Sequence, residues 1–321
     1  MSGLEEIRNE RLRKLELLKE KGINPFPVSA KKSSDISEVL GDFEKLLEKN
    51  KSLNIVGRIM AVRAHGGSIF FDLSDGTGKI QAYVKKDEIG EESFSLFNDA
   101  ADIGDFVAVS GNPFITKKNE KTIKASSWKM LAKSLRPLPE KWHGLSDVEE
   151  RFRKRYLDLL MNGDVRRRFV LRSKIISEIR KFLDKENFLE VDTPVLQTLA
   201  GGALAKPFKT HHNALNMDLY LRIAPELYLK RLLVGGFGKV YEIARNFRNE
   251  GIDATHNPEF TMLESYEAYR DADYLMGFTE KLLKMAVANS VGGDTIKFGA
   301  HEINFGGEYQ RVAYFDLFKR Y

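Results

Sequence analysis

Residues 245–266 constrain the fold more than any other part of this sequence. The segment reads Arg-Asn-Phe-Arg-Asn-Glu-Gly, continues through a short polar stretch, and ends in His-Asn-Pro-Glu-Phe-Thr-Met-Leu-Glu-Ser-Tyr. We predict two strands joined by a loop at residues 251–257. Because side chains alternate across a strand, Arg248 and Glu250 are expected on one face of the first arm.

The second arm of this hairpin is expected to present a matching face. The same alternation places together Phe260, Met262, Glu264 and Tyr266. Buried polar groups normally have partners, so this set is unusual to bury unless a ligand satisfies it. An ordinary amphipathic hairpin with surface salt bridges is the plain alternative. The order of these residue types, with Pro258 at the start of the return arm, favours a binding site.

The composition is that of a globular protein, since 42% of the 321 residues are hydrophobic and 30% are charged. That length suggests two domains. The net charge of +5 permits a polyanionic partner without requiring one. The lack of cysteine excludes disulfides, cysteine-ligated zinc and cysteine nucleophiles. We expect a cytoplasmic protein without membrane contact, because no signal-peptide pattern or membrane-length apolar run is present.

The first 135 residues predict a helical extension followed by a small barrel. In residues 1–50, apolar residues recur at helical spacing up to Leu18. Within residues 51–135, Asp75-Gly76 marks a hairpin turn between the second and third strands, and a short helical pattern follows the third. Five strands with a helix after the third is the order of an OB-fold, a barrel that often binds oligonucleotides. The strands are expected at residues 53–62, 69–73, 79–84, 106–114 and 122–131.

A run of Arg-Pro-Leu-Pro predicts a stiff linker, placed at residues 136–150, before a second domain at residues 151–321. Residues 151–172 contain eight basic and two acidic residues. Such a run is typical of a solvated helix face, with contact to RNA phosphates as the alternative. Apolar spacing predicts a helix at residues 170–183, and Pro194 keeps the chain before it extended.

The hairpin resembles motif 2 of the class II aminoacyl-tRNA synthetases, and the helix, strand and proline before it resemble motif 1. Residues 201–232 resemble the class II lysyl-tRNA synthetases nearly word for word: they contain Gly-Gly-Ala, Thr-His-His-Asn-Ala-Leu and Tyr-Leu-Arg-Ile-Ala-Pro-Glu-Leu-Tyr-Leu-Lys-Arg-Leu. The resemblance implies an α+β chain: an N-terminal OB-fold β-barrel that binds the anticodon, then an incomplete class II catalytic domain built on an antiparallel sheet. It also implies ATP-dependent attachment of lysine to tRNA(Lys), and a homodimer formed through motif 1.

The resemblance assigns a set of residues to the lysine substrate. Glu226 and Glu264, with Glu250, would set three carboxylates against the single guanidinium of Arg248. A cationic substrate relieves that imbalance, whereas an aspartate worsens it. The residues matched to lysine binding are Gly202, Glu226, Arg248, Glu250 and Tyr266.

A second set is assigned to ATP. A guanidinium meets phosphate and carboxylate oxygens well, so Arg248 and Glu250 are the expected catalytic residues. The Phe260 ring offers a stacking face for adenine. Mg²⁺ is the expected metal, with its ligands unassigned, because His211 and His212 have no third ligand nearby in the sequence. The residues matched to ATP binding are Arg248, Glu250, His256, Asn257 and Phe260.

In the barrel, the resemblance matches Phe70 and Gln81 to positions that read the uridine-rich lysine anticodon, by stacking and by hydrogen bonds. Arg63 is a candidate phosphate contact. A core position is the plain alternative for Phe70, because one of Phe70 and Phe71 must face the barrel interior. Ser127 departs from the acidic residue expected at its place in the family.

Two alternatives stay open at this point. One is an aspartyl- or asparaginyl-tRNA synthetase, which shares the barrel and both motifs, although the acidic residues argue against it. The other is a non-catalytic tRNA-binding paralogue. Neither motif 3 nor the acidic magnesium ligands of the family have a match up to Tyr321. We therefore expect a C-terminally truncated synthetase that lacks part of the ATP site and does not complete the reaction alone.

Overall fold

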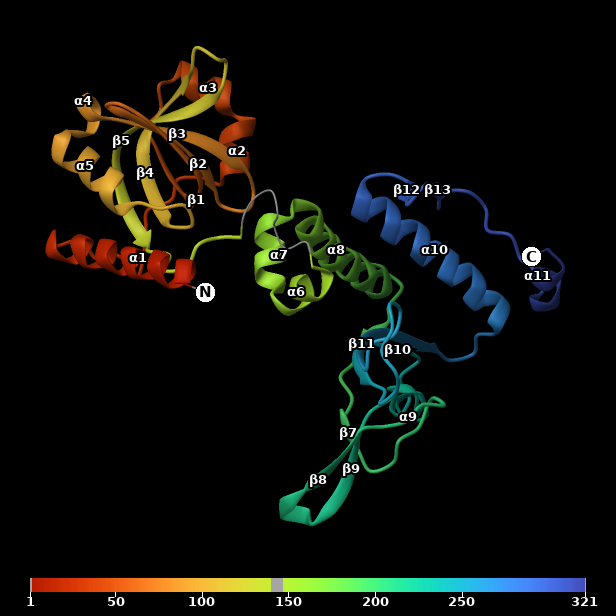
Figure 1. The fold of residues 1–321 in the computed structure, drawn as a ribbon. Helices are drawn as coiled ribbons and strands as arrows, with labels where there is room; N and C mark the ends of the chain where they lie inside the picture. The colour runs from red at the N-terminus through yellow and green to blue at the C-terminus, as the bar shows by residue number, and fades with distance from the viewer. Residues whose placement is uncertain (1, 140–146, 321) are drawn as a thin grey trace. The chain divides into compact units, whose positions relative to one another are not determined.

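A computed structural model describes residues 2–139 and 147–320. The contacts within it divide the chain into two compact units, Met1–Val165 and Arg166–Tyr321 (Figure 1). The predicted linker at residues 136–150 includes residues 140–146, which lie outside the described residues.

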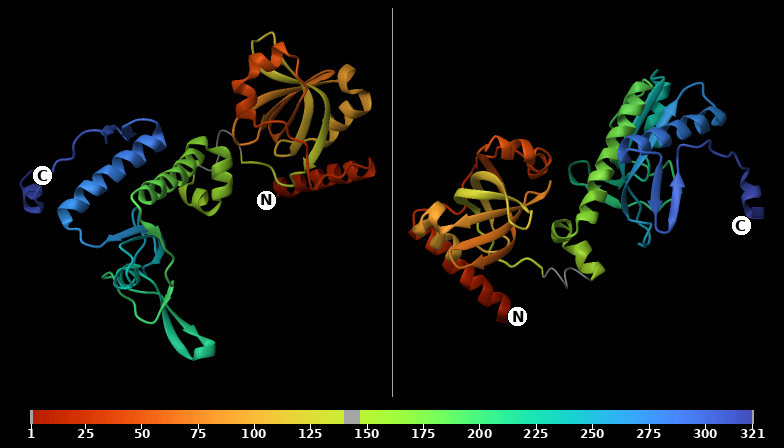
Figure 2. Two further views of the ribbon diagram at one scale, coloured as in Figure 1. Left: turned by 180° about the vertical axis from the view of Figure 1, so that it is seen from behind. Right: turned by 90° about the horizontal axis from the view of Figure 1, so that it is seen from above.

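The first unit is built around a closed barrel with the strand order β1-β2-β3-β5-β4 (Figure 2). β3 and β5 run parallel, and the other neighbouring strands run antiparallel. The helices α4 (Lys86–Ile89) and α5 (Glu91–Ala100) follow the third strand. This arrangement confirms the predicted OB-fold. The strands are β1 (Leu53–His65), β2 (Ser68–Ser74), β3 (Lys79–Lys85), β4 (Phe106–Ile115) and β5 (Lys121–Ala132).

Alternation along the strands decides which side chains fill the barrel. On β2, Phe71 is fully buried and its ring centroid lies 4.8 Å from that of Phe97 on α5. The neighbouring Phe70 therefore projects to the outer surface of the barrel, where it is half-buried. This position removes the core alternative for Phe70.

Helices surround the barrel. α1 (Ser2–Glu20) buries Leu15 and Leu18, and the chain turns after it at Gly22, where φ is +71°. The predicted N-terminal helix is thus confirmed, with a glycine at the backbone conformation that favours it. Two shorter helices, α2 (Ile36–Gly41) and α3 (Phe43–Glu48), precede β1.

The basic run begins in two short helices, α6 (Val148–Arg153) and α7 (Arg155–Met161). Part of its charge is paired locally: Arg153 contacts Glu149 at 2.7 Å, and Lys154 contacts Glu150 at 2.6 Å. Such i,i+4 pairs are typical of solvated helix faces.

The second unit contains two long helices, α8 (Gly163–Lys185) and α10 (Ala272–Val291), and three small sheets. The sheet orders are β11-β10-β6, β7-β9-β8 and β12-β13. α9 (Glu226–Val234) contacts both β10 and β11. A 3₁₀ turn (Asn213–Leu215) links β8 to β9, and α11 (Tyr314–Arg320) lies last. The strands are β6 (Leu189–Glu190), β7 (Leu196–Gln197), β8 (Lys209–His212), β9 (Met217–Leu221), β10 (Lys239–Phe247), β11 (Glu259–Glu267), β12 (Thr295–Phe298) and β13 (His301–Asn304).

The β10–β11 hairpin has two different faces. Tyr241 and its odd-numbered neighbours pack against α8 and α10, in a core that includes Phe182 and Phe278. The even-numbered residues form the opposite face, because Asn246 pairs with Phe260 and Glu242 with Glu264 in the antiparallel register. The predicted shared face of the second arm is therefore confirmed.

None of the helices in the described ranges is long and apolar enough to cross a membrane.

Candidate functional site

Arg248 lies at the end of the even-numbered face of the hairpin. Its amide donates a hydrogen bond to the Pro258 carbonyl at 2.8 Å, which extends the ladder one residue beyond β10. Its guanidinium carbon lies 5.0 Å from the centroid of the Phe260 ring. Arg248 Nε is buried without a hydrogen-bond partner among the described residues. A half-buried guanidinium with one buried, unpaired donor is suited to an anion.

The prediction that Glu250 shares a strand face with Arg248 is wrong. Pro258 has no N–H to donate to the Arg248 carbonyl, and that carbonyl instead accepts the Glu250 N–H at 3.0 Å. The chain therefore bends off the strand before Glu250. The Glu250 side chain accepts a hydrogen bond from the Lys206 N–H at 3.3 Å, at the exposed end of the hairpin.

Glutamates gather on the even-numbered face. Glu264 accepts a hydrogen bond from the Tyr266 hydroxyl at 3.2 Å. Burial raises the pKa of Glu264, and the negative charges of Glu226 and Glu242 raise it further. Burial, Glu264 and Glu226 likewise raise the pKa of Tyr266. These carboxylates are close enough to repel one another, so a cation placed among them is stabilised.

The three glutamates differ in their partners. Glu242 is buried and bound by Arg222 Nη1 at 2.5 Å and by the Thr193 hydroxyl at 2.6 Å. Glu226, the first residue of α9, contacts Lys230 Nζ at 2.6 Å. Glu264 has no bonded cation within the described part of the chain. We call Glu226, Glu242 and Glu264 the acidic group.

Sequence reasoning missed Arg222, Thr193 and Glu242. Glu242 is found by continuing the two-residue alternation of β10 backward from Arg248. Nothing in the sequence pattern points to Arg222 or Thr193, because they approach β10 from separate segments of the chain.

Gly202 lies against the start of α9. Its φ is +88°, and a Cβ built on it would lie 3.0 Å from the Glu226 Cβ and 3.2 Å from the Ala224 Cβ. A Cβ at Gly201 would lie 2.6 Å from Leu227 Cδ1. The two glycines therefore allow the backbone to run close beside Glu226, which is more than a plain turn requires.

His256 and Asn257 lie in the exposed loop between the strands. His256 Nδ1 contacts Asp253 Oδ2 at 2.8 Å. Backbone hydrogen bonds led by the Thr255 N–H, together with His256, hold the pKa of Asp253 well below its usual range. The loop is organised by these internal contacts.

The outer surface of the barrel carries a row of three aromatic rings, which we call the aromatic strip. The Phe70 ring stacks on Tyr83 with centroids 4.5 Å apart, and Tyr83 lies 5.8 Å from Phe114. The Tyr83 hydroxyl is 3.1 Å from the Ser68 hydroxyl. Arg63, opposite Phe70 on β1, contacts Asp72 at 2.8 Å. Half-buried aromatic rings on the outer surface, beside a basic residue, suit stacking of nucleic-acid bases.

Gln81 lies next to this strip, with both ends of its amide held. Its Nε2 donates to Glu120 Oε2 at 2.9 Å, and its Oε1 accepts from the Thr122 hydroxyl at 3.0 Å. Ser127 pairs with Ser110, farther along β5 than the Gln81–Thr122 pair. The carboxylate next to Gln81 is that of Glu120, a contact that the sequence pattern did not indicate.

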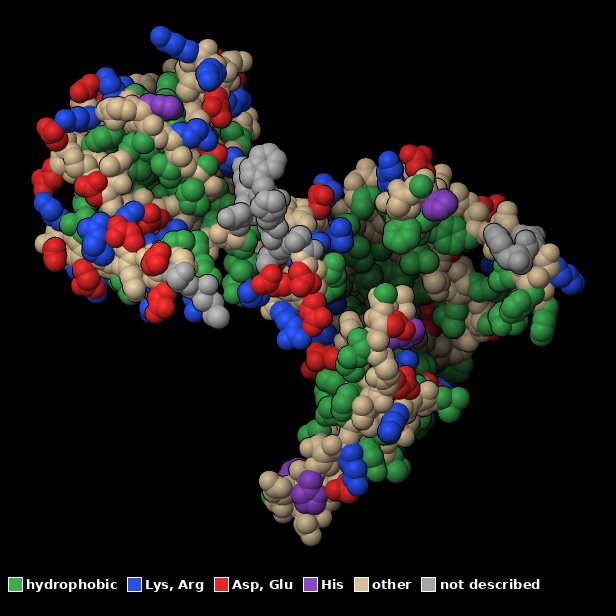
Figure 3. Space-filling model, viewed as in Figure 1, with side chains coloured by type: hydrophobic (Ala, Val, Ile, Leu, Met, Phe, Trp, Pro, Cys, Tyr) green, Lys and Arg blue, Asp and Glu red, His purple; other side chains and the backbone are tan. Residues whose placement is uncertain are grey.

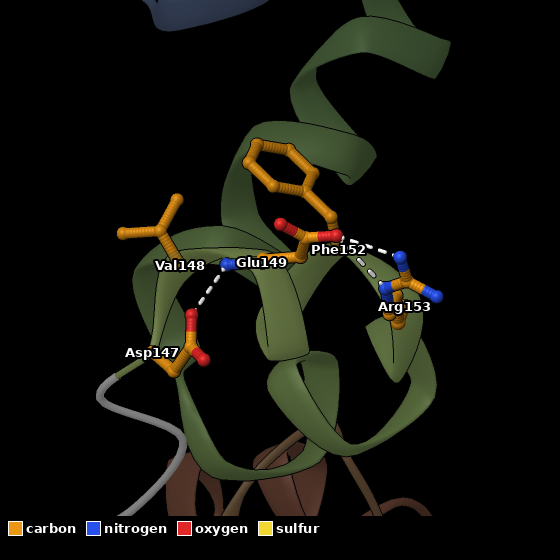
Figure 4. Close-up of a pocket in the computed structure, with 5 residues that line it drawn as sticks. All are labelled: Asp147, Val148, Glu149, Phe152 and Arg153. Atoms are coloured by element: carbon orange, nitrogen blue, oxygen red, sulfur yellow. Dashed lines mark hydrogen bonds and ion pairs between the residues drawn. The ribbon is translucent and has the colours of Figure 1, made fainter.

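Other candidate sites are weaker. No group of three metal-ligand side chains occurs in the residues that the structure describes. Histidines lie at the far end of the β8–β9 hairpin (Figure 3), where His211 contacts Asp218 at 3.0 Å. A hollow at the start of α6 is lined by residues whose polar groups largely bond one another, such as Arg153 with Glu149 (Figure 4). The lining residues are Asp147, Val148, Glu149, Phe152 and Arg153.

Two family models match this chain. Residues 147–321 match the family model of class II tRNA synthetases (D, K and N), and residues 53–131 match that of the OB-fold nucleic acid binding domain. The lysine–tRNA ligase of Carboxydothermus hydrogenoformans is 52% identical over 309 residues, covering 96% of this chain and 63% of that protein. Lysine–tRNA ligase 2 of Methanosarcina acetivorans is 49% identical over 323 residues, covering 100% of this chain and 63% of that protein.

A third relative, the lysine–tRNA ligase of Aquifex aeolicus, is 53% identical over 269 residues, covering 84% of this chain and 45% of that protein. The chain thus spans less than two thirds of the length of these curated relatives. The synthetase model nevertheless covers more than half of the chain, and the barrel matches separately. This chain therefore belongs to the class II tRNA synthetases (D, K and N).

Proposed function

We propose that the chain functions as a lysine–tRNA ligase, which activates lysine with ATP and transfers it to tRNA(Lys). The observation that carries the proposal is the acidic group, in which Glu226 of α9 faces Glu242 and Glu264 on the hairpin face that also carries Arg248. The relatives' names agree with this assignment.

The lysine side chain is assigned to Glu226. That carboxylate already binds an ammonium group of the protein, Lys230 Nζ, at 2.6 Å. Gly202 leaves room beside it, and Tyr266 supplies a hydroxyl next to Glu264. Glu242 is held by the buried Arg222, whereas the partner of Glu226 is the exposed Lys230 and Glu264 has no bonded cation among the described residues. Glu226 and Glu264 are therefore the carboxylates available to a cationic substrate.

Arg248 is assigned to the reacting groups. In amino-acid activation, a carboxylate oxygen of lysine attacks the α-phosphorus of ATP, and pyrophosphate leaves. A guanidinium that contacts both anions aligns them and offsets charge developing on phosphorus. The unpaired Nε of Arg248 supports this role, and Phe260 beneath it offers a ring face for adenine.

The remaining site residues are assigned from the family resemblance. Glu250 is placed with both lysine and ATP as the second catalytic residue, held at the hairpin end by the Lys206 amide. His256 and Asn257 are assigned to the distal phosphates. For Mg²⁺, the residues present do not form a ligand set, since the described ranges contain no three-residue acidic or histidine cluster suited to a metal. None of the residue roles proposed above depends on a bound Mg²⁺.

The barrel is assigned to the anticodon. The aromatic strip offers stacking faces, and Gln81, fixed by Glu120 and Thr122, offers a second amide proton to a base edge. Arg63 is assigned to a phosphate of the RNA.

We place the ligase activity in the cytoplasm, where charged tRNA is used.

A homodimer through the motif 1 region is part of the proposal. Val170 on α8 is 62% exposed, and Leu196 and Leu199 after it are also exposed. Apolar side chains of this kind suit burial against a second copy. Sedimentation of the purified chain tests this, because a monomer at micromolar concentration would contradict it.

Titration calorimetry tests the substrate assignment. The chain is titrated separately with L-lysine, L-aspartate and L-asparagine. Of the three amino acids, we expect only lysine to bind measurably, because an aspartate adds a negative charge to the acidic group. Tighter binding of aspartate or asparagine would indicate one of the other specificities covered by the family model. Binding of tRNA without any amino acid would indicate a non-catalytic paralogue.

A further inference from the structure

Two buried polar atoms on one face of the hairpin lack hydrogen-bond partners in the described structure: Oδ1 of Asn246 and Nε of Arg248. Asn246 is completely buried. Its side-chain nitrogen is 3.5 Å from the sulfur of Met262, a weak acceptor. Buried polar groups are nearly always paired, and each exception calls for a physical explanation.

These two atoms lie on the same side of the hairpin. The ladder continues through the Arg248 N–H and the Pro258 carbonyl, so Asn246 and Arg248 both project onto the face that carries Phe260. Their Cα atoms are separated by about 7 Å along the strand, which an arginine and an asparagine side chain can span. One unpaired atom is a donor and the other is an acceptor. They are complementary, but the guanidinium lies over the Phe260 ring instead.

We propose that Asn246 is a positioning residue for Arg248. When an anion draws the guanidinium off the Phe260 ring, Asn246 Oδ1 accepts the Arg248 Nε–H. The two terminal nitrogens of Arg248 then face the anion, and the Phe260 ring face is uncovered. Asn246 touches neither substrate. The inference rests on the proposed function, in which Arg248 binds a phosphate of ATP.

This role predicts opposite effects on stability and on binding. Leucine has the same branched arrangement of side-chain heavy atoms as asparagine and no polar atoms, so Asn246→Leu removes an unpaired acceptor from the core. We expect its melting temperature to equal or exceed that of the wild type. Its affinity for ATP should fall about tenfold or more, as for a lost hydrogen bond to a charged group. An asparagine with a purely structural role would lose stability and keep its affinity.

Arg248→Lys provides the decisive comparison, because lysine keeps the positive charge but has no Nε–H. If Asn246 acts through that atom, Asn246→Leu has no further effect on ATP affinity in the Arg248→Lys background. Asn246→Ala is a second variant with the same expected loss of affinity. Asn289→Leu is a control for the same substitution elsewhere: the exposed Asn289 lies on α10 and donates to Glu178 of α8 at 2.9 Å, away from the even-numbered face of the hairpin.

The experiment is calorimetric titration of the 321-residue chain and these variants with ATP at one pH and salt concentration, with melting temperatures measured in parallel. No ATP binding by the wild type would overturn both the proposed function and this inference. Equal affinities of wild type and Asn246→Leu would overturn the inference alone. A tenfold loss that persists in the Arg248→Lys background would also overturn it, because the effect would not pass through Nε.

Discussion

Arg222 and Glu242 form a buried ion pair, with 2.5 Å between Nη1 and Oε1, inside the second unit. Arg222 also donates to the Thr193 and Arg245 carbonyls, at 3.0 and 2.9 Å, so it joins β10 to two other segments. Arg222 thus neutralises the charge of Glu242, one member of the acidic group. It therefore supports the geometry of the proposed lysine site as well as the fold.

Arg222→Met should destabilise the second unit by about 3–5 kcal/mol, because Glu242 would be left buried without its cation. Native-state hydrogen exchange of the β10 amides measures this locally. Arg153→Ala breaks the exposed Arg153–Glu149 pair and serves as the control, with little expected change. Unchanged protection of β10 in Arg222→Met would show that the pair carries no net stability.

Glu226→Gln should weaken lysine binding by about 1.5–3 kcal/mol, the range for a hydrogen bond to a charged group. Calorimetric titration with L-lysine measures the change. Glu150→Gln, on α6 of the other unit, is a control of the same chemistry and should bind lysine normally. Unaltered affinity in Glu226→Gln would remove Glu226 from the lysine site.

The pH dependence of lysine binding should reveal Glu264. Burial, with Glu226 and Glu242, raises its pKa, so the proton is held more tightly in the folded protein than in the unfolded chain. Its contribution to stability is present below the ordinary glutamate pKa and is lost as the pH rises through the raised value. Lysine affinity should change in the opposite sense, increasing over the same interval as the carboxylate ionises. Glu264→Gln should flatten that increase, and an unchanged pH profile would contradict the assignment.

The parts of the fold that follow from local alternation could be predicted from sequence. The strands of the barrel and the shared face of Phe260, Met262, Glu264 and Tyr266 depend on residues two apart, so the pattern itself carries the information. The OB-fold followed from the order of those strands. Glu250 was misplaced because the missing N–H of Pro258 on the opposite arm redirects the Arg248 carbonyl.

Contacts between distant segments could not be predicted in this way. Gln81 and Glu120 are brought together by the parallel pairing of β3 with β5, and Arg222 reaches Glu242 from another strand region. The sequence contains these residues, but their spacing does not indicate which partners they meet. The same limit applies to Asn246, because its burial depends on packing that the sequence pattern does not show.

The aromatic strip predicts a graded loss of RNA binding. Tyr83→Ala and Phe114→Ala should each weaken binding of a UUU-containing stem-loop, on the order of 1–3 kcal/mol for each base that loses its ring. Tyr83→Phe keeps the ring and loses only the Ser68 contact, so it should bind nearly as the wild type does. Fluorescence anisotropy at one fixed salt concentration provides the measurement.

Phe26→Ala is the control for the strip, because Phe26 is a half-exposed ring in the first unit outside the row. It should leave RNA affinity unchanged. Equal losses for Phe26→Ala and Phe114→Ala, or equal binding of a scrambled loop, would mean that the strip does not read the RNA.

Gly202→Ala should lower both stability and lysine affinity, for two separable reasons. A positive φ costs a non-glycine residue about 1–2 kcal/mol, and the new Cβ would also press on Glu226 at 3.0 Å. Gly236→Ala isolates the first effect, since Gly236 has φ +100° and open space around its Cβ position. Both variants should therefore lose stability, but only Gly202→Ala should displace Glu226 and weaken lysine binding in calorimetry. Similar lysine affinities for the two variants would place Gly202 outside the substrate site.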